Sequence, residues 1–399
     1  MNAKKQFSIA LYFFFGISIL GLILRLVPVY PLGINFSNFL HAHSHVAFLG
    51  WLHGGFISLI SYIFLRKKLN TRYFRFIYLF TIFNIAGMYI SFPIQGYKLF
   101  SIIFLSLFLI STYLFLSYFF KHKQDIDIYP ATYKFTKAGL WLMFVSSLSP
   151  WSLVFILKMF GKESNFYKYD IFYYLHFQYN GWFLFAMIAI TMYLLERRNI
   201  RLCHRQTKLI YGLLLIAVFF GYFSNTLWAN PGIFYNILAF IGGFAEIAAI
   251  LYLFRLLVKY RIYIKQPISD FSYRILKIIL FSLMLKSVLQ FVGSFQYYAD
   301  LSYLIRDFII GYLHLIMLGI FTPFLLIIAK ELNFIELKSA HFYTFYFGFL
   351  ITEAVIFFRA TLLWFGVNFS AYIFNLILFI FTLLMFTGIS LITSFKNKI

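Results

Sequence analysis

The sequence predicts an all-α integral membrane protein: a single bundle of twelve transmembrane helices with both termini in the cytoplasm. Of its 399 residues, 62% are hydrophobic and only 12% are charged, whereas a soluble domain has about half apolar and about a quarter charged residues. Apolar runs of about 20 residues, the length that crosses a bilayer, follow one another with short charged segments between them. These observations exclude a soluble enzyme and a nucleic-acid-binding protein, and the predicted partner is the lipid bilayer, in the inner membrane of a bacterial cell.

The apolar runs give the expected spans in chain order. They cover residues 7–30, 39–65, 74–93, 97–120, 136–160, 171–194, 208–227, 232–256, 272–294, 303–328, 341–359 and 363–394. No segment rich in Gly, Ser or Pro divides the chain. We therefore expect residues 1–399 to form a single transmembrane domain.

The positive charges support this count independently. The even-numbered loops and the two termini carry 26 of the 34 Lys and Arg residues, the odd-numbered loops carry seven, and Lys286 lies within a span. Lys and Arg gather in cytoplasmic loops of membrane proteins. The alternation therefore predicts cytoplasmic termini. The single cysteine, Cys203, excludes an internal disulfide, a CxxC site and a CxxCH heme attachment.

Histidines stand out among the polar residues of the predicted spans. Six of the nine lie in or at the ends of the second, sixth and tenth spans: His41, His43, His45, His53, His176 and His314. These three spans run inward from the outer face, and at 1.5 Å per residue they place His45, His176 and His314 in the outer half of the bilayer. Neutral imidazole is a common ligand of metals and heme iron. Hydrogen bonding between helices is the alternative, and the metal candidates are His41, His43, His45 and His176.

The second and tenth spans share a local pattern. The segment from His43 to Gly50 and the segment from Tyr312 to Gly319 align on His-x-x-x-Leu-Gly, so that His45 matches His314 and His43 matches Tyr312. We predict that His45 and His314 are the axial ligands of one b-type heme, with His43 as the alternative ligand on the second span.

These motifs resemble the heme-copper oxidase subunit I superfamily, whose members have twelve helices and cytoplasmic termini. The segments 42–51 and 306–319 are similar to the family's second and tenth helices, and 173–182 lies where the family has a copper-ligating histidine. The resemblance implies that His45 and His314 hold a low-spin heme and that His176 is a remnant of the copper site. A second family with a histidine in its second helix is the NnrS-type heme proteins.

Two departures from the family pattern bear on function. Residues 208–227 contain no histidine, where the family has two copper ligands, and Tyr312 replaces the proximal ligand of the oxygen-reducing heme. The resemblance therefore implies an electron-transfer protein that binds heme b, with copper unlikely and no working dioxygen-reduction site. Respiratory-chain subunits or an electron donor are the expected partners. If the protein is an enzyme, it is an oxidoreductase related to terminal oxidases or nitric oxide reductases.

Other polar residues in the spans leave a second function open. Glu246 and Lys286 reach similar depths in the eighth and ninth spans, where they form either a structural ion pair or part of a proton path. With His176 they would line the polar path of a heme-free transporter or channel. In the heme interpretation, we expect Arg359, near the outer end of its span, to meet a heme propionate.

Overall fold

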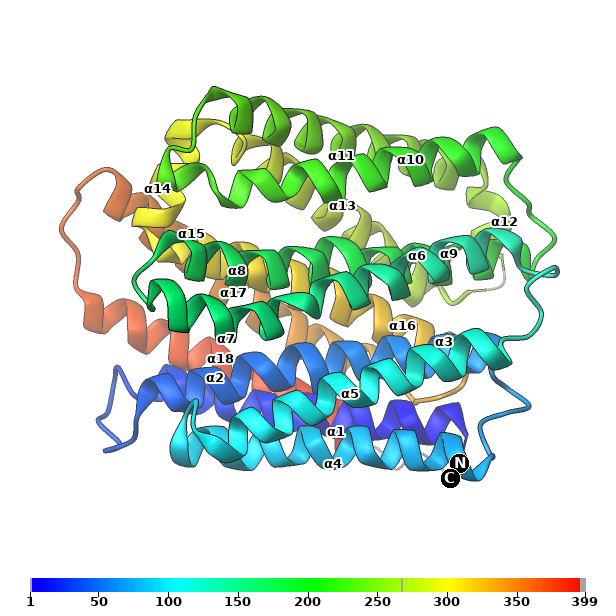
Figure 1. Ribbon diagram of the computed structural model, residues 1–399, viewed down its shortest axis with the longest axis horizontal. Helices are drawn as coiled ribbons and strands as arrows, with labels where there is room; N and C mark the ends of the chain where they lie inside the picture. Colours follow the sequence, from blue (N-terminus) through cyan, green and yellow to red (C-terminus); the bar gives the residue numbers. More distant parts are fainter. Residues whose placement is uncertain (1, 267, 395–399) are drawn as a thin grey trace. The chain divides into compact units, whose positions relative to one another are not determined.

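The computed structural model describes residues 2–266 and 268–394, and every regular element in these residues is a helix (Figure 1). Twelve helices in the described ranges are long and apolar enough to cross a membrane, which confirms the all-α class and the expected number of spans. They are Ala3–Leu26, Phe36–Phe64, Arg72–Gln95, Leu99–His122, Pro130–Phe160, Asn165–Glu196, His204–Ala229, Ile233–Lys259, Asp270–Val292, Arg306–Glu331, Ser339–Trp364 and Ala371–Ser394.

The chain divides into two compact units. Unit 1 contains residues up to 125 and from 322 onward, and unit 2 contains residues 126–321. The tenth span contributes to both, because its first half belongs to unit 2 and its second half to unit 1. The single domain expected over 1–399 stays a prediction.

Unit 1 holds the first four spans, the second half of the tenth and the last two. Its elements are α1 (Ala3–Leu26), α2 (Phe36–Val46), η1 (Ala47–His53), α3 (Gly54–Phe64), α4 (Arg72–Gln95), α5 (Leu99–His122), α16 (Thr322–Glu331), α17 (Ser339–Trp364) and α18 (Ala371–Ser394). In its core, Phe14 stacks on Trp51 with ring centroids 4.7 Å apart. The Trp51 indole NH donates to the Thr322 hydroxyl at 2.9 Å, so this buried ring keeps its polar atom satisfied.

Unit 2 holds the fifth to ninth spans and the first half of the tenth. Its elements are α6 (Pro130–Ser146), α7 (Leu148–Phe160), α8 (Asn165–His176), η2 (Phe177–Phe183), α9 (Leu184–Glu196), α10 (His204–Gly221), η3 (Tyr222–Asn225), η4 (Leu227–Ala229), α11 (Ile233–Lys259), α12 (Arg261–Lys265), α13 (Asp270–Val292), α14 (Gln296–Leu304), α15 (Arg306–His314) and η5 (Leu315–Phe321). The helices α10 and α11 approach closely at Gly221 and Gly242. A Cβ atom on Gly242 would lie 2.1 Å from the backbone nitrogen of Gly221, so the absence of a side chain at Gly242 permits this approach.

Polar residues at the helix ends explain several boundaries. The side chains of Asn35, Thr71 and Ser269 each accept a hydrogen bond from the backbone NH three residues later, at the start of α2, α4 and α13. Gly96, with φ of 64°, ends α4 in a conformation that favours glycine. The α-helix of the fifth span is interrupted at Ser147. Pro150, in the following turn, has no backbone NH and cannot donate the usual helical hydrogen bond to a carbonyl of the preceding turn.

Three spans differ from the others in burial and in winding. In the second, sixth and tenth spans, 83%, 89% and 78% of the residues in the most apolar stretch are buried. In the other nine spans of the described residues, this share is only 28% to 44%. Each of the three changes from α-helix to a seven-residue π-helical segment part-way along: η1, η2 and η5. Such segments are frequent at functional sites.

The eleventh span is longer than the sequence predicts. The helix α17 continues to Trp364, and α18 begins only at Ala371, so Arg359 lies within α17 and not at its outer end. The Arg359 guanidinium donates to the side-chain oxygen of Asn375 on α18 at 3.1 Å. This bond joins the last two spans of unit 1.

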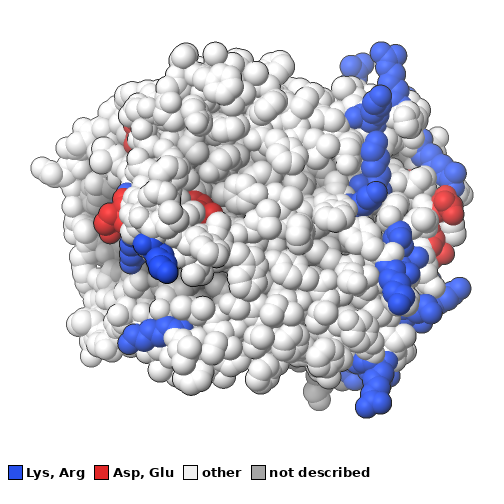
Figure 2. Space-filling view, in the orientation of Figure 1, with Lys and Arg blue, Asp and Glu red and all other residues white. Residues whose placement is uncertain are grey.

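Charged side chains occupy a restricted part of the visible surface. In Figure 2, a broad central area carries almost no Lys, Arg, Asp or Glu, and most of the visible Lys and Arg residues gather on the right of the view. Exposed apolar side chains such as Phe76, Leu79 and Phe83 lie along the lipid-facing sides of the helices. This distribution is that of a protein embedded in a lipid bilayer.

Candidate functional site: a buried ion-pair network

A buried ion pair lies within unit 2. The Lys286 ammonium on α13 is 2.5 Å from a carboxylate oxygen of Glu246 on α11, and the two side chains are 3% and 1% exposed. Two charges removed from water are retained only where they are paired and hydrogen-bonded, because the loss of hydration is expensive. The surrounding residues must therefore satisfy the remaining hydrogen-bonding groups.

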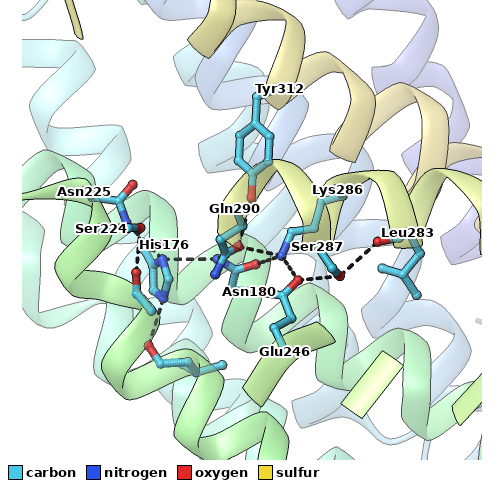
Figure 3. Close-up of polar contacts among 12 residues, drawn as sticks. His176, Asn180, Ser224, Asn225, Glu246, Leu283, Lys286, Ser287, Gln290 and Tyr312 are labelled. Atoms are coloured by element: carbon cyan, nitrogen blue, oxygen red, sulfur yellow. Dashed lines mark hydrogen bonds and ion pairs between the residues drawn. The ribbon is translucent and has the colours of Figure 1, made fainter. Parts of the chain in front are cut away.

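Side chains from η2 and α13 complete this pair (Figure 3). Besides Glu246, the Lys286 ammonium donates to the amide oxygen of Asn180 on η2 and, at 2.8 Å, to the amide oxygen of Gln290 one turn along α13. The Ser287 hydroxyl lies 2.9 Å from the Glu246 carboxylate oxygen that contacts lysine. All three donors of the ammonium group thus have acceptors. We call Asn180, Glu246, Lys286, Ser287 and Gln290, together with His176 and Tyr312, the Lys286 network.

His176 is joined to the network through amides. Its Nε2 lies 2.8 Å from the Val218 carbonyl, and its Nδ1 lies 3.1 Å from the side-chain nitrogens of both Asn180 and Asn225. A carbonyl can only accept and these amide nitrogens can only donate, so the ring is neutral with its proton on Nε2. Both ring nitrogens of this predicted metal ligand therefore bond to groups of unit 2.

Tyr312, which the sequence comparison aligns with His43, also belongs to the network. Its hydroxyl donates to the amide oxygen of Gln290 at 2.9 Å, and its ring packs edge-on against Tyr179 with centroids 6.2 Å apart. The first half of the tenth span thereby contributes a polar group to the same cluster as the sixth, eighth and ninth spans.

The network retains unsatisfied polar atoms. Within residues 2–266 and 268–394, neither the second carboxylate oxygen of Glu246 nor the amide nitrogen of Gln290 has a hydrogen-bond partner. The amide nitrogen of Gln290 lies beside Gly221, where an added Cβ atom would come within 2.9 Å of it. A buried polar atom without a partner is costly, so the ion pair is complete on the lysine side and incomplete on the glutamate side.

The predicted ligand His45 has a different environment in unit 1. Its Nδ1 donates to the His41 carbonyl at 2.8 Å, and its Nε2 accepts from the Tyr97 hydroxyl at 2.9 Å. Its ring stacks on Phe92 with centroids 4.7 Å apart. A backbone carbonyl on Nδ1 fixes the tautomer that presents Nε2 to a metal or heme iron, so the donor chemistry of His45 fits an axial ligand once the tyrosine moves away.

The histidines of the second span do not point the same way. His41 and His45 share a face, with ring centroids 6.5 Å apart, whereas His43 lies against α1, where its Nδ1 is 3.1 Å from the Ile17 carbonyl. This separation follows from helix geometry, since residues two apart point in nearly opposite directions. Throughout the described ranges, no three His, Cys, Asp or Glu side chains are grouped so that they could hold a metal ion.

The remaining predicted residues lie in separate places. His314 is the last residue of α15 in unit 2, half-buried, and η5 begins directly after it. His45 belongs to unit 1, and Arg359, also in unit 1, bonds to Asn375. The axial pairing of His45 with His314 and the contact of Arg359 with a propionate stay predictions.

Sequence reasoning missed Asn180 and Gln290, which bridge the network. One signal near Asn180 was present, because this residue lies between the histidine and the glycine of a recurring pattern. The pattern is a histidine and a glycine five residues later, and it occurs in all three buried spans as His45-x₄-Gly50, His176-x₄-Gly181 and His314-x₄-Gly319. Comparison of the second and tenth spans alone left the sixth outside the repeat. Gln290 gave no comparable signal beyond a polar residue one turn from Lys286.

Comparison with known proteins gives no family. No protein-family model matches this chain, and no curated protein matches it at a significant level. The similarity to heme-copper oxidases therefore remains an expectation based on three short motifs and the number of spans.

Proposed function

We propose that this polytopic membrane protein is a redox protein that binds one b-type heme through His45 and His314. The proposal rests on a pattern that recurs in the three most buried spans. Each of them has a histidine, a π-helical segment that starts within two residues after this histidine, and a glycine five residues after the histidine. Repeated irregularity of this kind in central helices is typical of a functional site, and imidazole is the ligand type that low-spin heme uses.

The residues around His45 have defined roles in this proposal. The His41 carbonyl holds the ring in the tautomer that presents Nε2, and Phe92 fixes the plane of the ring. Tyr97 supplies the hydroxyl that the heme iron would replace. A heme with two histidine ligands supplies one-electron transfer, because no coordination position is left open for a substrate.

The test is a reduced-minus-oxidised optical spectrum of the full-length protein purified after expression with heme supplied. We expect a sharp low-spin b-type band that is lost in His45→Ala and in His314→Ala. Tyr97→Phe should keep the band, since it removes only the hydroxyl that competes for Nε2. His204→Ala, an exposed residue at the start of α10, is the matched control. A protein without this band, or one that keeps it in both alanine variants, would refute the proposal.

The Lys286 network favours a second candidate, a heme-free proton path. Ionisable side chains inside membrane spans often mark ion or proton pathways. Here a buried ion pair has a carboxylate oxygen without a hydrogen-bond partner in the described ranges.

Proton flux into proteoliposomes tests this second candidate. With an imposed potassium diffusion potential and a pH-sensitive dye inside the vesicles, we expect the wild-type protein to acidify the lumen faster than protein-free vesicles do. The double variant Lys286→Met/Glu246→Gln should abolish the difference, and Lys162→Met, in an exposed loop of the same unit, should not. Equal rates for the wild type and the double variant would rule out a path through this network.

A further inference from the structure

The surface of unit 2 is strongly cationic where α11 ends and α13 begins. Residues 255–277 contain six Lys and Arg residues and a single acidic residue, Asp270. The six are Arg255, Lys259, Arg261, Lys265, Arg274 and Lys277, and all of them are exposed. None belongs to the Lys286 network or to the proposed heme ligands, so neither candidate function accounts for this surface.

The short helix α12 presents apolar side chains among these cations. Ile262 and Tyr263 are 62% and 61% exposed, whereas Ile264 is only 8% exposed. The Arg198 guanidinium donates to the Ile264 carbonyl at 3.5 Å and so joins α12 to the loop that follows α9. Large apolar side chains are unfavourable in water. The exposure of Ile262 and Tyr263 is therefore favourable where an apolar phase covers them.

The place of α12 in the chain identifies this phase as lipid. The helices α11 and α13 are both long and apolar enough to cross a membrane, and α12 lies in the connection between them. Its residues therefore lie near the level at which the hydrocarbon of the bilayer meets water. Segments that combine exposed apolar side chains with Lys and Arg bind at this interface.

The cations select the charge of the lipid headgroup. The ammonium groups of Lys265 and Lys277 lie 5.9 Å and 4.9 Å from the centroid of the Tyr273 ring, so two positive charges gather around one side chain of α13. The Asp270 carboxylate is 3.9 Å from the Lys265 ammonium, and both side chains are more than half exposed. An exposed pair at this distance is weak, which leaves the surface positive.

We propose that α12 and the first turns of α13 bind the headgroup of an anionic phospholipid. Arg261, Lys265 and Lys277 supply the positive charge, and Ile262 and Tyr263 contact the lipid. Exposed cations alone would also attract a soluble phosphate, but the apolar side chains contribute to binding only when the anion carries acyl chains. This lipid site is independent of the proposed heme and of the second candidate function.

Fluorescence quenching in vesicles tests the lipid site. In a Cys203→Ser background, Gln266→Cys gives the full-length protein a single thiol directly after α12, to which a fluorophore is attached. The phosphatidylcholine vesicles contain the same fraction of nitroxide-labelled phosphatidylglycerol or of nitroxide-labelled phosphatidylcholine. We expect the anionic lipid to bind about fivefold more tightly, or more, since each Lys or Arg near an anionic surface contributes about that factor. Equal quenching by the two lipids, or no quenching by either, would overturn the proposal.

A triple variant removes the proposed charges. In Arg261→Gln/Lys265→Gln/Lys277→Gln, the two nitroxide lipids should quench equally, because the attraction for the anionic headgroup is lost while Ile262 and Tyr263 still contact lipid. All three substituted residues are exposed, so the fold does not depend on them. A preference for phosphatidylglycerol that persists in this variant would contradict the assignment.

Two controls distinguish this site from other effects of charge. Lys67→Gln/Arg72→Gln/Arg75→Gln changes three exposed residues of unit 1 and lowers the net charge by the same amount, so it should keep the preference. An equal loss in both triple variants would attribute the preference to net charge and overturn the assignment. Glycerol phosphate, added at constant ionic strength, should not change the preference. If it abolishes the preference, the surface binds soluble phosphates and the lipid site is refuted.

Discussion

Lys286 and Glu246 depend on each other because each is the counter-charge that makes the burial of the other tolerable. Removal of one partner leaves an uncompensated charge in the interior, which costs about 3–5 kcal/mol in buried pairs. We expect Lys286→Met and Glu246→Gln each to destabilise the protein by about that amount. The double variant should be more stable than either single variant, since it contains no unpaired charge. The difference is measured by denaturant unfolding of each variant in detergent.

This prediction has a clear contrary outcome. If the effects of the two single substitutions add in the double variant, the residues do not interact in the folded state. Ser287→Ala provides the scale for a single hydrogen bond, because it keeps both charges and removes only the hydroxyl that lies 2.9 Å from Glu246. We expect its effect to be about 1.5–3 kcal/mol, the usual range for a hydrogen bond to a charged group.

Part of the candidate site was predictable at the scale of residues. His176, Glu246 and Lys286 are conspicuous because ionisable and imidazole side chains are rare in apolar spans. Asn180 and Gln290 are less conspicuous, because a side-chain amide in a span carries no charge from which an oppositely charged partner could be predicted. Which groups an amide joins depends on the packing of several helices, and neither hydropathy nor spacing within one helix specifies it.

At the scale of elements, hydropathy predicts where helices cross the membrane but not how they are wound. Twelve spans were expected and twelve are present in the described residues, with most ends displaced by only a few residues. The π-helical segments η1, η2 and η5 were not predicted. A change from the i+4 to the i+5 hydrogen-bond pattern leaves the apolar character of the segment unchanged, so no hydropathy signal marks it.

Glycine positions give a better indication of these elements. Gly50 and Gly181 lie within η1 and η2, where a Cβ atom would come within 3.0 Å of Val46 and Leu142, respectively. A larger residue there would push against a neighbouring side chain, and the histidine five residues earlier completes the repeated pattern. The sixth span therefore belongs with the second and tenth as a third copy of one motif.

At the scale of the whole molecule, the number of spans and the side on which each loop lies are separate questions. An even number of spans places both termini on one side of the membrane. Hydropathy does not say which side, and the charge of the loops does. The asymmetry, with 26 Lys and Arg residues on one side and seven on the other, predicts that the termini and the even-numbered loops face the cytoplasm.

The single cysteine makes this assignment directly testable. Cys203 is exposed and lies between the sixth and seventh spans, in a loop predicted to be cytoplasmic. A membrane-impermeant maleimide should therefore label it only after spheroplasts of the expression host are permeabilised. In a Cys203→Ser background, Lys162→Cys places a thiol in an exposed loop predicted to face outward, which intact spheroplasts should expose to the reagent. The opposite pattern would show that the topology is inverted. Labelling of both thiols from the same side would contradict the single span Asn165–Glu196, because one crossing between residues 162 and 203 places them on opposite sides of the membrane.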